Sequence, residues 1–376
     1  MPQSFELVGL DGANPLGFLA AVGTLVSLHE TRVGEPRLHW KRAHRWVPIL
    51  SGVDAEDEQE LASIVADSLR GRLVPEDAEA RRAAAQKEME LAKTAIRKKR
   101  DEIRKRGLRG NERIQALERE LRPLEYEYEE KRRRWLTALR EAIPRPELAL
   151  GKRIDCTSKE YREHAVGLAA TANRSNREAL DLLASFGTDV VCQKNSDSIQ
   201  PTPFCFITGS GHQFFLDTVR QLVIRVTSER IYRTLFMPWD YGDEGLSMRW
   251  DPIEDRRYAL MDRDPTAPGN KPRTMWMANL LAYRALVLFP TAPVGRGLAT
   301  AGWDLRERYF TWPFWECPLS VDGVRSLVQL RQLFEELPDA FSLRARGVVA
   351  VYRAQRVEVG TGVNQKVNFS AAQGVA

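Results

Sequence analysis

The sequence contains few of the residues that build disulfide or metal sites. Its four cysteines, Cys156, Cys192, Cys205 and Cys317, include no close pair, and its five histidines form no His-Glu-x-x-His pattern. Disulfide frameworks and the common zinc motifs both depend on such spacings. We therefore expect no disulfide-stabilised fold, no metal site and no cofactor.

Long apolar runs are also missing. No segment approaches the roughly 18 consecutive apolar residues of a membrane-spanning helix. The N-terminus shows no basic region followed by an apolar run and a cleavage site, as a secretory signal would. The sequence therefore favours a cytoplasmic location without a membrane partner.

Charged residues are abundant but unevenly placed. Residues 77–143 hold 20 of the 56 basic residues and 14 of the 51 acidic residues, which leaves 36 basic and 37 acidic residues elsewhere. At 376 residues and 43% hydrophobic content, the chain is long enough for two domains or for one with a large insertion. The excess positive charge therefore lies in one segment.

The stretch from Asp11 to Leu25 predicts a helix that organises the N-terminal part. Asn14 is a suitable N-cap and Pro15 a suitable first residue, so a helix is expected to run to about Glu30. Gly17 and Gly23 are tolerated in a helix only where another segment approaches the backbone closely. The pattern favours a core helix on a sheet. The loop from Asp11 to Asn14 could also hold a phosphate, although it lacks the lysine and glycine spacing of an ATP-binding loop.

A basic turn is predicted after this helix. Residues 37–40 and 46–50 have the pattern of two short strands, joined by a segment that contains Lys41, Arg42 and Arg45 between two tryptophans. Cations neutralise phosphates and aromatic rings stack on unpaired bases, so this turn is a candidate nucleic-acid contact. A solvated turn with Trp40 and Trp46 in the core is an equally good interpretation.

Residues 77–143 predict two long charged helices. Apolar residues recur at three- and four-residue steps over about 79–106 and again over 114–135, and Gly107–Asn111 separates the two arms. Pro123 should kink or restart the second arm. An antiparallel hairpin of coiled-coil type is expected, as a docking arm or a strut. The basic run Arg97, Lys98, Lys99 and Arg100 makes nucleic-acid contact a further hypothesis.

Two polar loops are candidates for reading bases. Asn173, Arg174 and Arg177 lie between two predicted helices, and Lys194 and Asn195 precede a predicted buried strand over 202–207. Arginine and asparagine can pair in a bidentate manner with base edges, although capping turns explain the same residues.

A second anion site is predicted where this strand leads into a helix expected over 214–236. Ser210, between two glycines, and Gln213 would lie at the junction, where backbone amides attract anions. Ser210 has no histidine and acid at the spacing of a hydrolase, so no nucleophile is expected.

Acidic residues cluster further along the chain. Asp251, Glu254, Asp255, Asp262 and Asp264 could form a two-metal nuclease site, but neighbouring arginines and prolines favour ion-paired turns. The cations of this region are further nucleic-acid candidates: Arg256, Arg257, Lys271 and Arg273. The remaining pattern predicts a helix over 274–289, a strand over 309–315, a helix over 321–337 and a closing hairpin of 347–352 with 355–359.

Together these patterns predict an α+β fold. We expect a mixed sheet with packed helices and an inserted antiparallel helical hairpin. The predicted boundaries are 1–76 for the N-terminal portion of the core, 77–143 for the inserted arm and 144–376 for the remainder of the core.

The order of several short motifs resembles one family. Asn14-Pro15 is followed by Thr202-Pro203-Phe204, by Gly209–Leu216 and by Trp239-Asp240-Tyr241. Trp250-Asp251-Pro252, Asp255–Leu260, Ala278–Ala282 and Phe289-Pro290 complete the series. This series is similar to the large-subunit family of the type I-G (formerly I-U) CRISPR interference complex, Cascade. The match covers most of the chain outside the inserted arm, which departs from the family pattern.

The resemblance implies a non-enzymatic subunit of a crRNA-guided antiviral surveillance complex. In that role the subunit lies near the 5′ end of the guide, reads the short motif beside the target and begins strand separation. The implied partners are crRNA, target double-stranded DNA, the other complex subunits and a helicase-nuclease. The inventory of cations, amide side chains and aromatics suits this role. A coiled-coil scaffold or protein-docking factor and a divalent-metal nuclease remain the alternatives.

Overall fold

The computed structural model describes residues 3–154, 156–173, 177–207, 213–253, 273–359 and 366–376. The chain divides into two compact units, one made of Met1–Gly71 with Leu150–Ala376 and the other of Arg72–Ala149. The segment predicted as an insertion, 77–143, falls within the second unit. The described residues form helices and small antiparallel sheets, in agreement with the expected α+β class.

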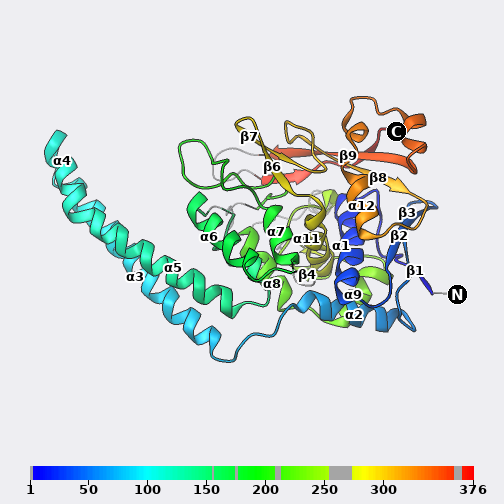
Figure 1. The fold of residues 1–376 in the computed structure, drawn as a ribbon, viewed down its shortest axis with the longest axis horizontal. Helices are drawn as coiled ribbons and strands as arrows, with labels where there is room; N and C mark the ends of the chain where they lie inside the picture. The colour runs from blue at the N-terminus through cyan, green and yellow to red at the C-terminus, as the bar shows by residue number, and fades with distance from the viewer. Residues whose placement is uncertain (1–2, 155, 174–176, 208–212, 254–272, 360–365) are drawn as a thin grey trace, which may run out of the picture. The chain divides into compact units, whose positions relative to one another are not determined.

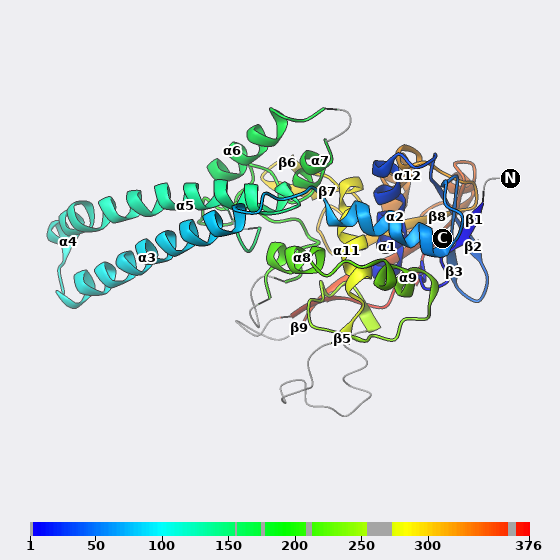
Figure 2. The same cartoon turned by 90° about the horizontal axis from the view of Figure 1, so that it is seen from below.

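A buried helix lies at the centre of the first unit. Helix α1 (Pro15–Thr31) begins where Asn14 accepts a hydrogen bond from the backbone N–H of Leu16, and every residue from Pro15 to Leu28 is buried. A helix that is apolar on all sides must be covered on all sides. It packs along α11 (Trp276–Ala285) and against α2 (Glu58–Arg70), which in turn contacts α9 (Ser228–Phe236) (Figure 1, Figure 2). The core helix predicted from Asn14 and Pro15 is confirmed.

The first unit also contains two larger antiparallel sheets. Strands β1 (Ser4–Glu6), β3 (Trp46–Ser51) and β2 (Arg37–Arg42) pair in that order. Strand β9 (Val348–Val359) pairs with β8 (Tyr309–Trp315), β10 (Lys366–Phe369) and β11 (Gln373–Gly374). Two smaller ladders join β4 (Asp243–Glu244) to β5 (Arg273–Thr274) and β6 (Thr291–Val294) to β7 (Gly297–Thr300).

Aromatic side chains join α1 to both sheets. Phe18 of α1 stacks on Trp40 of β2, with ring centroids 5.7 Å apart, and lies 5.6 Å from Trp312 of β8. Trp46 stacks on Phe314 at 4.3 Å. Trp40 and Trp46 are 1% and 4% exposed, so these indoles belong to the core and cannot stack on a nucleic-acid base. The base-stacking interpretation of the turn between β2 and β3 is therefore wrong, and its core alternative is confirmed.

The other helices that the structure describes in the first unit are short. They are α6 (Ser158–Ala169), α7 (Glu178–Ala184), α8 (Phe215–Val223), α12 (Val321–Val328) and α13 (Ala340–Arg344), with 3-10 turns at Leu286–Leu288 and Arg331–Phe334.

The second unit consists of long helices that lie side by side. Helix α3 (Ala78–Lys105) packs along α5 (Arg122–Ala142), and α4 (Gly110–Ala116) with a π-helical turn at Leu117–Leu121 connects them (Figure 2). Arg81 pairs with Glu141 at one end and Arg100 with Glu125 towards the other, so the two helices run in opposite directions. Pro123 lies in the first turn of α5, which confirms the predicted restart. A 3-10 turn at Pro146–Leu148 ends the unit.

Several local expectations are wrong. The described strands form separate antiparallel sheets instead of one mixed sheet. Residues 202–207 are buried but form no strand, because Pro203 has no N–H to donate and Cys205 closes a turn onto Thr202. The helix expected over 214–236 is interrupted, since Thr227 caps a new helix, α9.

The two C-terminal expectations also need correction. The helix expected over 321–337 ends at Val328. The expected closing hairpin of 347–352 and 355–359 is instead the single strand β9. Neither Arg353 nor Ala354 is of a residue type that favours a turn, so the strand continues through them.

His39 of β2 makes stability depend on pH. Its Nδ1 atom is buried and has no hydrogen-bond partner among the described residues, and burial lowers the pKa of His39 from its ordinary 6.5. The unfolded chain therefore binds the proton more readily. This contribution to stability is present above pH 6.5 and is lost as pH falls towards the lowered pKa.

We predict that the free energy of unfolding falls between about pH 7.5 and about pH 5.5, and that His39→Gln makes this fall smaller. Urea denaturation of both proteins at both pH values measures the difference. Equal pH dependence in the two proteins would contradict the assignment.

Candidate functional site

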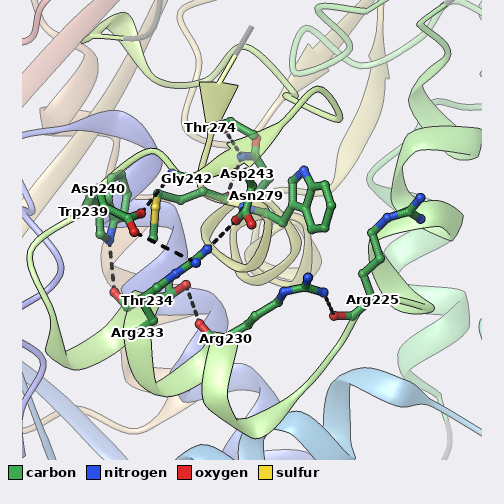
Figure 3. A network of polar contacts seen from close by, with 12 residues as sticks. Arg225, Arg230, Arg233, Thr234, Trp239, Asp240, Gly242, Asp243, Thr274 and Asn279 are labelled. Atoms are coloured by element: carbon green, nitrogen blue, oxygen red, sulfur yellow. Dashed lines mark hydrogen bonds and ion pairs between the residues drawn. The ribbon is translucent and has the colours of Figure 1, made fainter. Parts of the chain in front are cut away.

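Two arginines of the first unit stack on one tryptophan. The guanidinium carbons of Arg225 and Arg230 lie 5.2 Å and 4.9 Å from the ring centroid of Trp276. Arg225 follows α8, Arg230 lies in the first turn of α9, and Trp276 begins α11. Three segments thus bring two cations, which Figure 3 labels as Arg225 and Arg230, to one partly exposed indole.

Trp276 is held rigidly in this arrangement. Its backbone N–H donates to Oδ2 of Asp243 at 2.8 Å, and its indole N–H donates to the carbonyl of Gly245 at 3.0 Å. One turn later in α11, Asn279 donates to Thr274 and accepts from the N–H of Met248 (Figure 3). The ring is therefore a fixed platform for the two guanidinium groups.

The charges of this network are only partly balanced. Arg233 donates to Asp243 at 2.8 Å, so that the buried carboxylate of the network is already occupied. Within the part of the chain that the structure describes, Arg225 and Arg230 form no ion pair. Two positive charges close together without a carboxylate attract an anion.

Most hydrogen-bond donors of these two arginines have no partner among the described residues. Arg225 donates one N–H to the carbonyl of Gln221 at 2.7 Å, and Arg230 donates one to the carbonyl of Arg225 at 2.9 Å. A guanidinium has five N–H donors in a planar fork, and among the described residues none of the nitrogens of these two groups is buried without a partner. The remaining donors can therefore bind an oxyanion such as a phosphate.

Sequence reasoning missed these residues for a physical reason. Arg225 and Arg230 lie on either side of a helix break inside what the pattern presents as one helix, and Trp276 lies some 50 residues further on. No local spacing connects the three. Arg273, three residues before Trp276, is the nearby residue predicted from the sequence to contact a nucleic acid. It is exposed.

The structure places the basic turn between β2 and β3 at the surface, with its cations partly engaged. Lys41 pairs with Glu6 at 2.8 Å, and Arg42 lies 5.7 Å from the ring centroid of Trp46. Arg45 donates to the carbonyl of Val8. Lys41 and Arg42 are exposed and keep further N–H donors, so nucleic-acid contact at this turn stays a prediction.

The predicted cations of α3 divide into two groups. Lys99 pairs with Glu102 at 2.6 Å, and this hydrogen bond raises the pKa of Lys99, while Arg100 pairs with Glu125 at 2.6 Å. Arg97 and Lys98 are exposed and form no ion pair among the described residues. Half of this basic run is thus neutralised by the hairpin itself.

The two polar loops remain separate candidates. Asn173 and Lys194 are exposed, and Asn195 is exposed with a left-handed φ of 60° within a turn. Arg177 pairs with Asp181 through two hydrogen bonds of 2.9 and 2.8 Å, which raise the pKa of Arg177. Gln213 accepts a hydrogen bond from Arg249 at 3.3 Å.

Other predicted positions lie outside the described residues. These are Arg174, Ser210, Glu254, Asp255, Arg256, Arg257, Asp262, Asp264 and Lys271.

Asp251, a candidate metal ligand, lies in the interior. It is 2% exposed and accepts hydrogen bonds from Nδ2 of Asn14 and from the hydroxyl of Tyr241, each at 2.8 Å. No group of three or more acidic, histidine or cysteine side chains suited to a metal occurs among the described residues. A carboxylate beside the start of α1 also disfavours the phosphate that was the alternative interpretation of Asp11–Asn14.

Comparison with models of protein families finds no match to this chain, and no curated protein is significantly similar to it. Of the helices that the structure describes, none combines the length and the apolar character needed to cross a bilayer.

Proposed function

We propose that this chain is a non-catalytic, nucleic-acid-binding subunit of a crRNA-guided antiviral surveillance complex of the type I-G kind. The observation that carries the nucleic-acid part is the pair Arg225 and Arg230 on Trp276. Two preorganised guanidinium groups that form no ion pair among the described residues suit a phosphate. The series of short motifs from Asn14-Pro15 to Phe289-Pro290 supports membership of the type I-G complex.

In this role the chain acts in the cytoplasm and recognises the motif beside the target. Its partners are crRNA, target double-stranded DNA, the other subunits and a helicase-nuclease that it helps to recruit. Phosphate contacts position a nucleic acid without reading its sequence, so Arg225 and Arg230 fix the strand. Asn173, Lys194, Asn195 and Gln213 are the candidates for contacting bases. In this proposal residues 77–143 form an antiparallel coiled coil that is inserted in the sequence between the two parts of this core.

The Arg225 and Arg230 assignment predicts a change in salt dependence. Arg225→Ala with Arg230→Ala should weaken binding of a labelled 30-base-pair DNA duplex at least about tenfold at low salt. It should also reduce the slope of log affinity against log salt by about 0.9 for each phosphate that the variant no longer neutralises. Fluorescence anisotropy over a series of KCl concentrations measures both quantities.

A control with the same change in charge removes two exposed guanidinium groups elsewhere in the same unit, through Arg331→Ala with Arg344→Ala. Neither of these arginines forms an ion pair within the described part of the chain. This variant carries the same change in net charge, so its slope should stay close to that of the wild type. An unchanged slope in the first variant, or an equal change in both, would contradict the site.

Membership of the complex has a separate test. The tagged chain, purified from its native host, should bring with it small RNAs that contain CRISPR repeat sequence. Purification of the stable chain without RNA and without partner subunits would contradict this part of the proposal.

A further inference from the structure

A groove of about 690 Å³ opens on the second unit, between α3 and the segment formed by α4 and the π-helical turn. Its walls carry cations and its floor carries aliphatic side chains. All of its lining residues lie between Lys93 and Leu121, so the groove belongs to this unit alone.

The cations form a regular stripe. Lys93, Arg97, Arg100 and Arg104 line one wall at steps of four, three and four residues, which places them on one face of α3. Arg113 lies on α4, and Asp101 is the one carboxylate among the lining residues. The groove therefore has a strong excess of positive charge.

Three of these cations are available to meet a ligand. Arg100 pairs with Glu125 at 2.6 Å and Arg104 with Asp101 at 3.1 Å. Lys93, Arg97 and Arg113 are exposed and form no ion pair among the described residues.

The floor is aliphatic and rigid. Ile96, Ile103 and Leu121 belong to the buried core of the hairpin tip, and Leu108 and Leu117 pack against that core while remaining half-exposed. Single-stranded nucleic acids are generally held on aromatic platforms, and no aromatic residue lines this groove. An aliphatic floor between basic walls instead suits an amphipathic helix with an acidic face.

We propose that this groove binds an acidic amphipathic helix of another protein. The stripe from Lys93 to Arg104 spans eleven steps along α3, about 17 Å at 1.5 Å per residue, which matches about three turns of a bound helix. The carboxylates of the bound helix would recur at three- and four-residue steps to meet Lys93, Arg97 and Arg113. Its aliphatic side chains would cover Leu108 and Leu117.

A second copy of this chain is a poorer occupant. Tyr126, which is 73% exposed, is the one large apolar side chain at the surface of the acidic part of α5. Glu127 and Glu130 already pair with Lys131 and Arg134 of the same helix, each at 2.6 Å. This face therefore offers little apolar surface and few available carboxylates.

The test uses the full chain and two labelled peptides of about 18 residues. One peptide repeats Glu and Leu with helical periodicity, and the other has the same composition in scrambled order. The helical peptide should bind at least about tenfold more tightly than the scrambled peptide, because only its leucines share one face. Arg97→Glu with Arg113→Glu should weaken it by about thirtyfold or more.

Lys87→Glu with Arg119→Glu is the matched control. Lys87 lies on α3 and Arg119 on the π-helical turn, and both are exposed, form no ion pair among the described residues and do not line the groove. The peptide affinity of this control variant should stay within about threefold of the wild type.

Equal binding of the two peptides, or an equal effect in the control variant, would overturn the proposal in favour of general charge attraction. Displacement of the helical peptide by an equimolar single-stranded RNA would favour a nucleic acid as occupant. Self-association that requires Arg97 and Arg113, measured by sedimentation, would favour a second copy. Each outcome is independent of Arg225 and Arg230.

Discussion

Gly23→Ala is expected to destabilise the protein by about 3 kcal/mol or more, or to prevent folding. An added Cβ at Gly23 would lie 1.7 Å from the carbonyl oxygen of Leu281 and 2.6 Å from its carbonyl carbon. Both atoms belong to the backbone of α11, which is buried and cannot yield as a flexible side chain would. The packing of α1 on α11 therefore depends on the absence of a side chain here.

The direction of this effect opposes helix propensity. Alanine in place of glycine stabilises an isolated helix by about 1 kcal/mol, so propensity alone predicts a more stable protein. Urea denaturation decides between the two effects. Gly297→Ala is the control, because its added Cβ would come no closer than 3.8 Å to the nearest atom, the carbonyl oxygen of Val294. Stability unchanged or increased by Gly23→Ala would show that the helices do not approach this closely.

Local sequence features predicted the elements that depend on local chemistry. Asn14 and Pro15 specify where α1 begins, and the predicted break at Gly107 separates α3 from α4 in the second unit. The glycine at position 23 correctly indicated that another backbone approaches α1, but its partner in α11 could not be named, since 258 residues separate Gly23 from Leu281. Such a contact has no local pattern.

The wrong or missing predictions concern features whose conformation is determined by contacts between segments distant in the sequence. Residues 202–207 are as apolar as a buried strand. Periodicity alone cannot distinguish a buried strand from a buried segment of another conformation. Strand β9 continues past Arg353 because β8 and β11 both pair with it there. The stack of Arg225 and Arg230 on Trp276 was missed because it depends on a helix break and on two distant segments.

Asp251 is expected to be a structural residue whose replacement affects stability far more than any activity. Its Oδ1 accepts hydrogen bonds from Nδ2 of Asn14 and from the backbone N–H of Ile253, at 2.8 and 2.9 Å. Its Oδ2 accepts one from the hydroxyl of Tyr241 at 2.8 Å. The carboxylate thus links the start of α1 to a segment more than 200 residues away in the sequence.

Asp251→Ala should therefore lower the free energy of unfolding by about 3 kcal/mol. The change removes this acceptor from the half-buried amide of Asn14 and from the buried hydroxyl of Tyr241, and the loss of a partner for a buried donor costs about 1–3 kcal/mol. Asp322→Ala is the control, since the Asp322 side chain is 82% exposed and pairs with Arg325, three residues away in α12. Its expected effect is below about 0.5 kcal/mol.

Urea denaturation of the two variants and of the wild type measures these differences, and incubation of each folded protein with labelled DNA and Mg²⁺ or Mn²⁺ tests for cleavage. The carboxylate accepts hydrogen bonds from Asn14, Tyr241 and Ile253 among the described residues, so a metal could reach these oxygens only by breaking them. A wild-type cleavage activity that disappears in a stably folded Asp251→Ala protein would contradict the structural role and favour the nuclease alternative.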